Sequence, residues 1–171
     1  VKFVRKTFRF SERREDNFIC GLSMGGYGAV KLALRNPERF SACASLSGAL
    51  DMNVDVKAGD PGWHTIVTSI WGEDYETALP GSEDDVIHLL KTFPEDKPKP
   101  RIYAACGTSD FLYQQNQTFR HAIADTEFEF KYEEGPGAHT WAFWDKWIVP
   151  ALKYIVKRIR MLMNLPPFSS L

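Results

Sequence analysis

Three residues far apart in the sequence have side chains that together could cleave an ester bond. Ser23 stands in the pentapeptide GLSMG (residues 21–25), Asp110 follows an apolar stretch, and His139 lies in a loop rich in glycine and proline. A serine hydroxyl becomes a nucleophile when a histidine removes its proton, and a carboxylate orients that histidine and stabilises its charged form. These residue types predict acyl transfer through a covalent intermediate, a reaction that requires no metal and no organic cofactor.

The sequence around Ser23 allows two interpretations. The stretch NFICGLSMGGYGAV (residues 17–30) passes from an apolar run through glycines into apolar residues at helical spacing. In one interpretation a sharp turn between a strand and a helix exposes the Ser23 hydroxyl, and small residues are needed on both sides of it. In the other, Ser23 is only the N-terminal cap of the helix. The predicted strand and helix on either side of the G-x-S-x-G pattern favour the nucleophile.

Two aspartates compete for the role of the acid, and four histidines compete for the role of the base. Asp51 and Asp110 both follow apolar runs, where an aspartate is also a common helix cap. The order serine, aspartate, histidine along the chain favours Asp110. His139 is preferred as the base because a loop residue after a strand can turn toward a serine. The other histidines lie in predicted helices or in an irregular segment: His64, His88 and His121.

The elements that must position these residues are predicted to be alternating strands and helices. Continuous apolar runs predict strands at 17–21, 40–48 and 100–107, and an alternating pattern predicts a fourth strand near the sheet edge at 127–134. Helices are predicted at 26–36, 82–93, 111–124 and 141–163, the last with a kink or break near Pro150. This order predicts an α/β fold with a mainly parallel sheet, whose strand carboxyl ends carry the chemistry.

The length and composition fit one globular domain. The chain has 171 residues, of which 44% are hydrophobic and 25% charged, and its net charge is -1. Residues 1–163 are expected to form a single domain and residues 164–171 a poorly ordered tail. The near-neutral charge gives no reason to expect a nucleic acid partner, and no apolar run is long enough to predict a membrane span.

The three cysteines, Cys20, Cys43 and Cys106, lie in apolar segments without the spacing of metal ligands. They predict reduced thiols and no metal site. No export signal is recognisable, so the expected location is the cytoplasm. The chain begins with valine rather than methionine, so we expect it to be part of a longer protein.

The segment from Asp51 to Gly81 fits neither helical nor strand periodicity and is predicted to pass over one end of the sheet. Aromatic and apolar residues in this segment and near the other loops predict a pocket for a small acyl or aryl group, although such residues belong more often to a core. The residues assigned to the pocket are Trp63, Trp71, Phe111, Leu112 and Trp141.

Four motifs together resemble the esterase D family of α/β-hydrolases. They are GLSMGGYGAVKLALRNPERF (21–40), SLSGALD (45–51), ACGTSDFLY (105–113) and GAHTWAFWDKWI (137–148). The resemblance is closest to tributyrin-esterase-like and acetyl- or feruloyl-esterase-like members, is more distant to S-formylglutathione hydrolases, and spans about residues 4–155. It implies an α/β-hydrolase-type sheet, Ser23 as nucleophile, His139 as general base, Asp110 as its orienting acid and the Met24 amide as one oxyanion donor.

The chain departs from the family at its N-terminus. Family members have several strands before the nucleophile strand, and a loop after one of them supplies a second oxyanion amide. The resemblance implies that these strands and this donor are missing here. The strand at 17–21 would then be an exposed apolar edge. This predicts either that upstream sequence accompanies the chain or that the edge pairs with a second copy to form a homo-oligomer.

Three functions stay open on the sequence alone. The first is a serine carboxylesterase whose partner is a small-molecule ester with a short acyl or aryl group. The second is a thioesterase similar to S-formylglutathione hydrolases, because the same triad serves both reactions. The third is an inactive fragment that acts as an interaction module.

Overall fold

A parallel sheet of four strands organises the molecule. The computed structural model describes residues 7–8, 10–53 and 61–163, and for residues 61–63 and 157–163 it describes the backbone alone. The strands are β1 (Phe18–Leu22), β2 (Ala42–Leu46), β3 (Arg101–Gly107) and β4 (Phe130–Gly135), and they lie side by side in the order β1-β2-β3-β4. All three pairings are parallel. The predicted α/β fold is therefore confirmed, with β4 at one edge of the sheet as expected.

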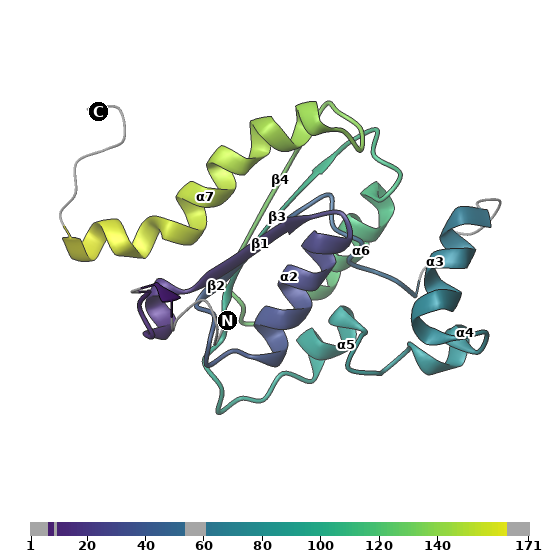
Figure 1. Ribbon diagram of the computed structural model, residues 1–171, viewed down its shortest axis with the longest axis horizontal. Coiled ribbons are helices and arrows are strands. Elements are labelled where there is room, and N and C mark those ends of the chain that lie inside the picture. Colours follow the sequence, from purple (N-terminus) through teal and green to yellow (C-terminus); the bar gives the residue numbers. More distant parts are fainter. Residues whose placement is uncertain (1–6, 9, 54–60, 164–171) are drawn as a thin grey trace.

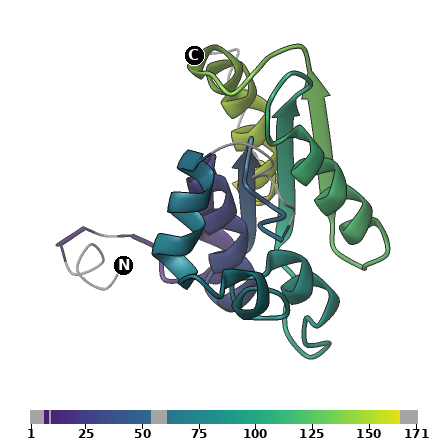
Figure 2. The same cartoon turned by 90° about the vertical axis from the view of Figure 1, so that its right-hand side faces the viewer.

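Helices cover both faces of this sheet. Figures 1 and 2 show α7 (Trp141–Met163) on one face and α2 (Met24–Arg35), α5 (Val86–Lys91) and α6 (Tyr113–Ala124) on the other. A short 3-10 helix, η1 (Arg14–Asp16), precedes β1. Because the four strands are parallel, the loops after β1, β3 and β4 meet at the same end of the sheet.

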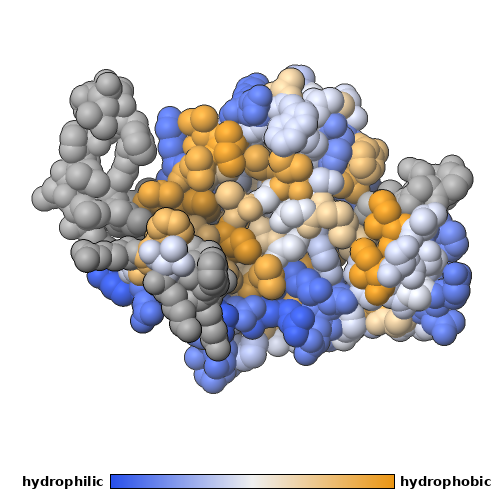
Figure 3. All heavy atoms as spheres, viewed as in Figure 1, coloured by the Kyte–Doolittle hydropathy of each residue, from blue (hydrophilic) through white to orange (hydrophobic). Residues whose placement is uncertain are grey.

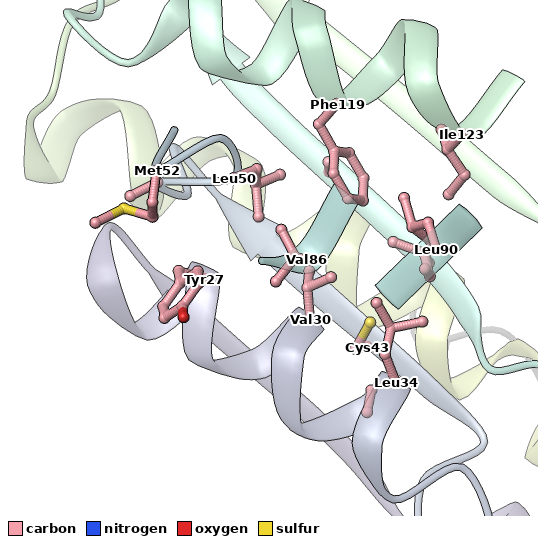
Figure 4. Packing of buried hydrophobic residues seen from close by; sticks show 14 of the residues in the cluster. Tyr27, Val30, Leu34, Cys43, Leu50, Met52, Val86, Leu90, Phe119 and Ile123 are labelled. Atoms are coloured by element: carbon pink, nitrogen blue, oxygen red, sulfur yellow. The ribbon is translucent and has the colours of Figure 1, made fainter. Parts of the chain in front are cut away.

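The strands β2 and β3 are apolar without alternation because both of their faces are covered. All five residues of β2 are buried. Cys43 packs on one face with Val30, Leu34 and Leu90 of the helices (Figure 4). The neighbouring residues Ala42 and Ala44 pack on the opposite face against α7. Two apolar clusters, one on each face, thus hold the sheet between its helices.

Two details differ from the sequence-based expectations. The segment expected to be irregular contains α3 (Pro61–Trp71) and α4 (Tyr75–Ala78). The sequence did not indicate α3 because apolar residues lie on more than one side of this helix. Ile66 and Ile70 are exposed, whereas Val67 is buried. The last helix is continuous through Pro150, so of the predicted kink or break only the kink stays a prediction. The predicted tail, residues 164–171, lies outside the described residues.

The strand β1 lies at the other edge of the sheet. Among the described residues it pairs with β2 alone. Its residues are half-buried or exposed, in contrast to those of β2. Leu32 of α2 and Val149 and Leu152 of α7 are exposed on the two helices that contact β1. Figure 3 shows apolar side chains gathered over this side of the molecule.

Candidate active site

Ser23 occupies the sharp turn between β1 and α2. Its backbone has φ 53° and ψ -127°, a conformation that is uncommon for a residue with a side chain. The amide of Ser23 donates a 3.0 Å hydrogen bond to the carbonyl of Leu46 at the end of β2, which fixes the turn against the sheet. The Ser23 side chain makes no capping hydrogen bond to α2. The hydroxyl is thus held away from the helix that follows it.

The turn depends on the absence of a side chain at Gly21. A Cβ atom at Gly21 would lie 2.3 Å from the carbonyl oxygen of Gly25, a backbone atom that cannot move aside easily. The first and last residues of the G-x-S-x-G pattern therefore touch each other, and the backbone folds back tightly around Ser23. This contact explains why the first of the two glycines is required.

Asp110 and His139 lie on two loops that contact each other through their backbones. Asp110 follows β3 and His139 follows β4. The amide of Thr108 donates to the carbonyl of Gly135 at 3.0 Å, and that of Ser109 donates to Gly137 at 2.9 Å. These hydrogen bonds extend the pairing of β3 with β4 past the ends of the strands. They place the carboxylate and the imidazole next to each other.

The side chains of Asp110, His139 and Ser23 form a continuous hydrogen-bonded series. Nδ1 of His139 lies 3.1 Å and 3.0 Å from the two carboxylate oxygens of Asp110, and Nε2 lies 2.9 Å from the Ser23 hydroxyl. Because an ionised carboxylate can only accept, Nδ1 carries the proton and Nε2 is free to accept from the hydroxyl. The Asp110 side chain is 0% exposed and that of His139 18% exposed.

The contact predicted between Asp110 and His139 is present, and Asp51 does not take part in it. Asp51 is buried after β2, where its carboxylate accepts from the amide of Asn53 at 3.2 Å. Asp110 accepts a second hydrogen bond from the amide of Leu112 at 2.9 Å, which anchors the carboxylate. Of the other histidines, His64 packs its ring against Tyr75 instead.

Aromatic rings surround the His139 imidazole. The ring centroid of Phe111 lies 4.6 Å from that of His139, and Phe111 is 60% exposed. The Trp144 ring lies 4.9 Å away and meets the imidazole edge-on at 88°. Trp141 packs on Trp144 at 5.2 Å and is 68% exposed. Phe111 therefore presents apolar surface against the imidazole, and Trp141 presents apolar surface on the outside of Trp144.

Two of the other residues assigned to a pocket, Leu112 and Trp71, are not at this surface. Leu112 is 1% exposed and belongs to the core cluster beneath the sheet end. Trp71 is half-buried at the end of α3 and donates its indole N–H to Asp84 at 2.6 Å. The side chain of Trp63 lies outside the described residues. Of the five predicted pocket residues, the structure thus brings Phe111 to the imidazole and Trp141 to the Trp144 ring that contacts the imidazole.

Two further residues at this site, Trp144 and Ser47, were not predicted from the sequence. The Trp144 ring contacts the imidazole, and its indole donates to the hydroxyl of Ser47 at 3.2 Å. The spacing of Trp141 and Trp144, three residues apart at the start of a helix, was a signal that both lie on one face. Ser47 follows β2 directly, at the same end of the sheet as Ser23 and Asp110.

The first turn of α2 offers a candidate oxyanion site. Met24 is the first residue of α2, so its amide has no acceptor within the helix and lies at the positive end of the helix dipole.

Across the described part of the chain, no group of three or more histidine, cysteine or acidic side chains could hold a metal ion. The helices described there include none with the length and apolar character of a bilayer span.

The chain is similar to several esterases. A family model described as "Putative esterase" matches residues 1–155. An acetyl esterase of Caldicellulosiruptor saccharolyticus is 33% identical over 165 residues, which cover 92% of this chain and 60% of that protein. Among solved structures, the substrate-bound fluorophosphonate-binding serine hydrolase F of Staphylococcus aureus is 34% identical with a TM-score of 0.78. The S-formylglutathione hydrolase of Staphylococcus aureus, solved as the apoenzyme, is 32% identical with a TM-score of 0.72.

The matches cover most of this chain but only part of each relative. Both structures align with 91% of this chain and 60% of their own chains. The chain thus spans about 60% of the length of the relatives that it matches. Because the family model covers most of the chain and the parallel sheet fits that of these hydrolases, the protein belongs to the esterase D-like family of α/β-hydrolases.

Proposed function

We propose that this chain carries the catalytic residues of a serine carboxylesterase that hydrolyses short-chain acyl or aryl esters. One observation carries the proposal: the hydrogen-bonded series from Asp110 through His139 to Ser23, with Ser23 held on a strained turn. Membership of an esterase family supports it, as does the similarity to an acetyl esterase. In this proposal Ser23 is the nucleophile, His139 the general base and Asp110 its orienting acid.

The first half of the proposed reaction forms an acyl-enzyme. Nε2 of His139 takes the proton of the Ser23 hydroxyl while Oγ attacks the ester carbonyl carbon. The carbonyl oxygen becomes negatively charged, and the Met24 amide stabilises it by a hydrogen bond. The bond to the alcohol then breaks, and His139 returns its proton to the departing oxygen. Asp110 stabilises the imidazolium ion during these steps.

The second half releases the acid. Water enters beside His139 and loses its proton to Nε2 as its oxygen attacks the acyl carbon. Collapse of the intermediate breaks the bond to Oγ, and His139 protonates Ser23 again. One oxyanion amide is assigned in this chain. Because loss of one such donor typically lowers kcat about 100- to 1000-fold, a second donor from elsewhere would raise the rate by a similar factor.

The aromatic surface beside His139 favours an oxyester over a glutathione thioester. His139 must protonate the leaving group, so the leaving group lies next to the imidazole. Phe111 contacts the imidazole there, Trp141 packs on the Trp144 ring beside it, and both are largely exposed. Their rings suit an apolar or aryl alcohol, whereas glutathione carries two carboxylates and an ammonium group. The similarity to an S-formylglutathione hydrolase keeps thioester hydrolysis as the second candidate.

Labelling with a fluorophosphonate probe tests the nucleophile. The probe forms a bond to an activated serine, so the chain should be labelled at Ser23, and Ser23→Ala should remove the label. Ser69→Ala, at an exposed position of α3, serves as a control for the loss of a serine hydroxyl elsewhere, and it should keep the label. A folded chain that is never labelled would refute the esterase proposal and favour an interaction module. Labelling that persists in Ser23→Ala would refute Ser23 as the nucleophile.

Turnover of two substrates separates the candidate reactions. The rate of p-nitrophenyl acetate hydrolysis is compared with that of S-formylglutathione hydrolysis under the same conditions. We expect a higher kcat/KM for the aryl ester, and substitution of Phe111 by Ser should lower this preference. A higher kcat/KM for the glutathione thioester would favour the second candidate.

A further inference from the structure

We infer that Ser47 is a positioning residue, which holds the His139 imidazole in place through Trp144. The inference rests on the proposed function, because it assigns a task to a residue behind the proposed base. Ser47 comes from the SLSGALD motif, whose residues have no part in the proposed reaction. Among the described residues Ser47 makes no hydrogen bond to Ser23 or Asp110, so its effect on the imidazole must pass through Trp144.

The backbone of Ser47 is held in an unusual conformation. Its φ is 47°, in the left-handed region, and Ser47 and Ser23 are the two residues other than glycine with positive φ in the described part of the chain. The Ser47 amide donates a 2.7 Å hydrogen bond to the carbonyl of Ala105, one step beyond the last paired residues of β2 and β3. Strained backbone of this kind persists where the surroundings enforce it, and it is found often at functional sites.

Ser47 joins three elements in the interior. Ser47 is 0% exposed, and its hydroxyl accepts the indole N–H of Trp144 in α7 at 3.2 Å. Burial and the nearby Asp110 charge raise the pKa of the Cys106 thiol in β3 to about 12, and the Ser47 hydroxyl opposes this rise. The thiol therefore stays neutral. Ser47, at the end of β2, is thus tied to both β3 and α7.

Trp144 is the more buried of the two aromatic residues whose rings contact the His139 imidazole. It is 8% exposed and meets the His139 ring edge-on, with the centroids 4.9 Å apart. Phe111, which also contacts the imidazole, is exposed and has fewer constraints. Without the Ser47 hydroxyl the indole N–H would be a buried donor with no acceptor, a state that disfavours the present position of the ring. The Trp144 ring would then shift, and the imidazole beside it would lose its support.

Loss of the Ser47–Trp144 hydrogen bond is expected to lower kcat rather than to weaken substrate binding. Displacement of a catalytic group by about 1 Å can lower a rate about 100-fold. We therefore expect about a 10- to 100-fold lower rate of fluorophosphonate labelling and of kcat when the Ser47–Trp144 bond is removed, with KM changed less than about threefold.

The test uses two ways to remove the hydroxyl and one to remove the N–H. Ser47→Ala keeps the backbone strain at φ 47°, whereas Ser47→Gly relieves it, so the two variants differ in stability but not in the lost hydrogen bond. Trp144→Phe keeps an aromatic ring and removes the donor. The matched control is Tyr103→Phe, which removes a 2.8 Å hydrogen bond to Glu133 in the same apolar cluster as Trp144.

The expected result is that Ser47→Gly, Ser47→Ala and Trp144→Phe are labelled slowly per folded molecule, while Tyr103→Phe is labelled at the wild-type rate. The double variant Ser47→Gly/Trp144→Phe should be no slower than either single variant, because both remove the same bond. Labelling of Ser47→Gly and Trp144→Phe within twofold of wild type would overturn the inference. So would independent, multiplicative effects in the double variant.

A second measurement separates this inference from the proposed function. The Nδ1 proton of His139, hydrogen-bonded to Asp110, gives a downfield proton signal in NMR spectra whether or not the chain is labelled. We expect a sharp signal in wild type and Tyr103→Phe, and a broadened or absent one in the Ser47 and Trp144 variants. If wild type is not labelled, the esterase proposal fails, and this signal still decides the positioning role. An unchanged sharp signal in Ser47→Gly would overturn that role.

Discussion

The Nε2 atom of His139 lies 2.9 Å from the hydroxyl oxygen of Ser23, although 116 residues separate the two in the chain. Neither residue reaches the other through local structure. Ser23 is placed by the turn after β1, and His139 by a loop after β4, at the opposite edge of the sheet. The parallel arrangement of the strands brings the two loops to the same end of the sheet.

Asp110→Asn should lower kcat about 10⁴-fold, because an amide cannot hold the His139 tautomer that accepts the Ser23 proton. The labelling rate with a fluorophosphonate probe measures the effect without a substrate. Asp51→Asn is the control, since Asp51 is also buried after a strand but bonds to the amide of Asn53. An equal loss of labelling per folded molecule in both variants would contradict the assignment of Asp110.

Gly21→Ala should destabilise the fold by about 1–3 kcal/mol and abolish labelling, because its Cβ would meet the Gly25 carbonyl at 2.3 Å. Gly28→Ala in α2 is the matched control, since nothing lies within 4 Å of the added Cβ. The control should stabilise the helix by about 0.5–1 kcal/mol. Thermal unfolding and labelling of both variants test the pair. Normal labelling of Gly21→Ala would show that the turn tolerates a side chain.

Stability should fall in acid partly through Asp84. Burial tends to raise the pKa of Asp84, but hydrogen bonds from Lys31 and Trp71 and the charges of Lys31 and Arg35 outweigh it and lower the pKa below its ordinary value of 3.8. Because the pKa of Asp84 is lower in the folded chain than in the unfolded chain, Asp84 stabilises the fold fully at pH values above the unfolded pKa. This stabilisation is lost as the pH falls through the folded pKa.

Urea unfolding at several pH values checks this linkage. The difference in free energy of unfolding between wild type and Asp84→Asn should be largest near pH 6 and should narrow below about pH 4. Glu83→Gln is the control, because the Glu83 side chain is 75% exposed and its pair with Arg35 contributes little. A difference between wild type and Asp84→Asn that stays constant down to pH 3 would rule out the stabilisation by Asp84.

The 171-residue chain should associate through the β1 edge. An exposed strand edge with apolar surroundings is a template for pairing with another chain. Cys20→Lys places a charge on β1 at an exposed position and should weaken the association, whereas Gln114→Lys adds the same charge to α6 and should not. Sedimentation velocity of the three proteins tests this prediction. A wild-type chain that is monomeric at high concentration would refute it.

The sequence by itself predicted the features that depend on neighbouring residues. Glycines around Ser23 between an apolar run and a helical pattern predicted the turn, because a tight backbone requires residues without side chains there. Continuous apolar runs predicted parallel strands such as β2, since burial on both faces removes alternation. The order of serine, aspartate and histidine favoured Asp110 over Asp51, and the hydrogen bond of Asp110 to His139 agrees.

Only the tertiary structure decided which residues meet around the imidazole. Phe111 and Leu112 are neighbours with similar apolar character, yet one is exposed beside His139 and the other is in the core. α3 escaped prediction because its exposed Ile66 and Ile70 obscured the pattern of its buried residue Val67. Ser47 and Trp144 are 97 residues apart, and no local pattern pairs them. The spacing of apolar residues along a segment indicates which of its faces are buried. Contacts between segments depend instead on the strand order and on how the helices pack across the sheet.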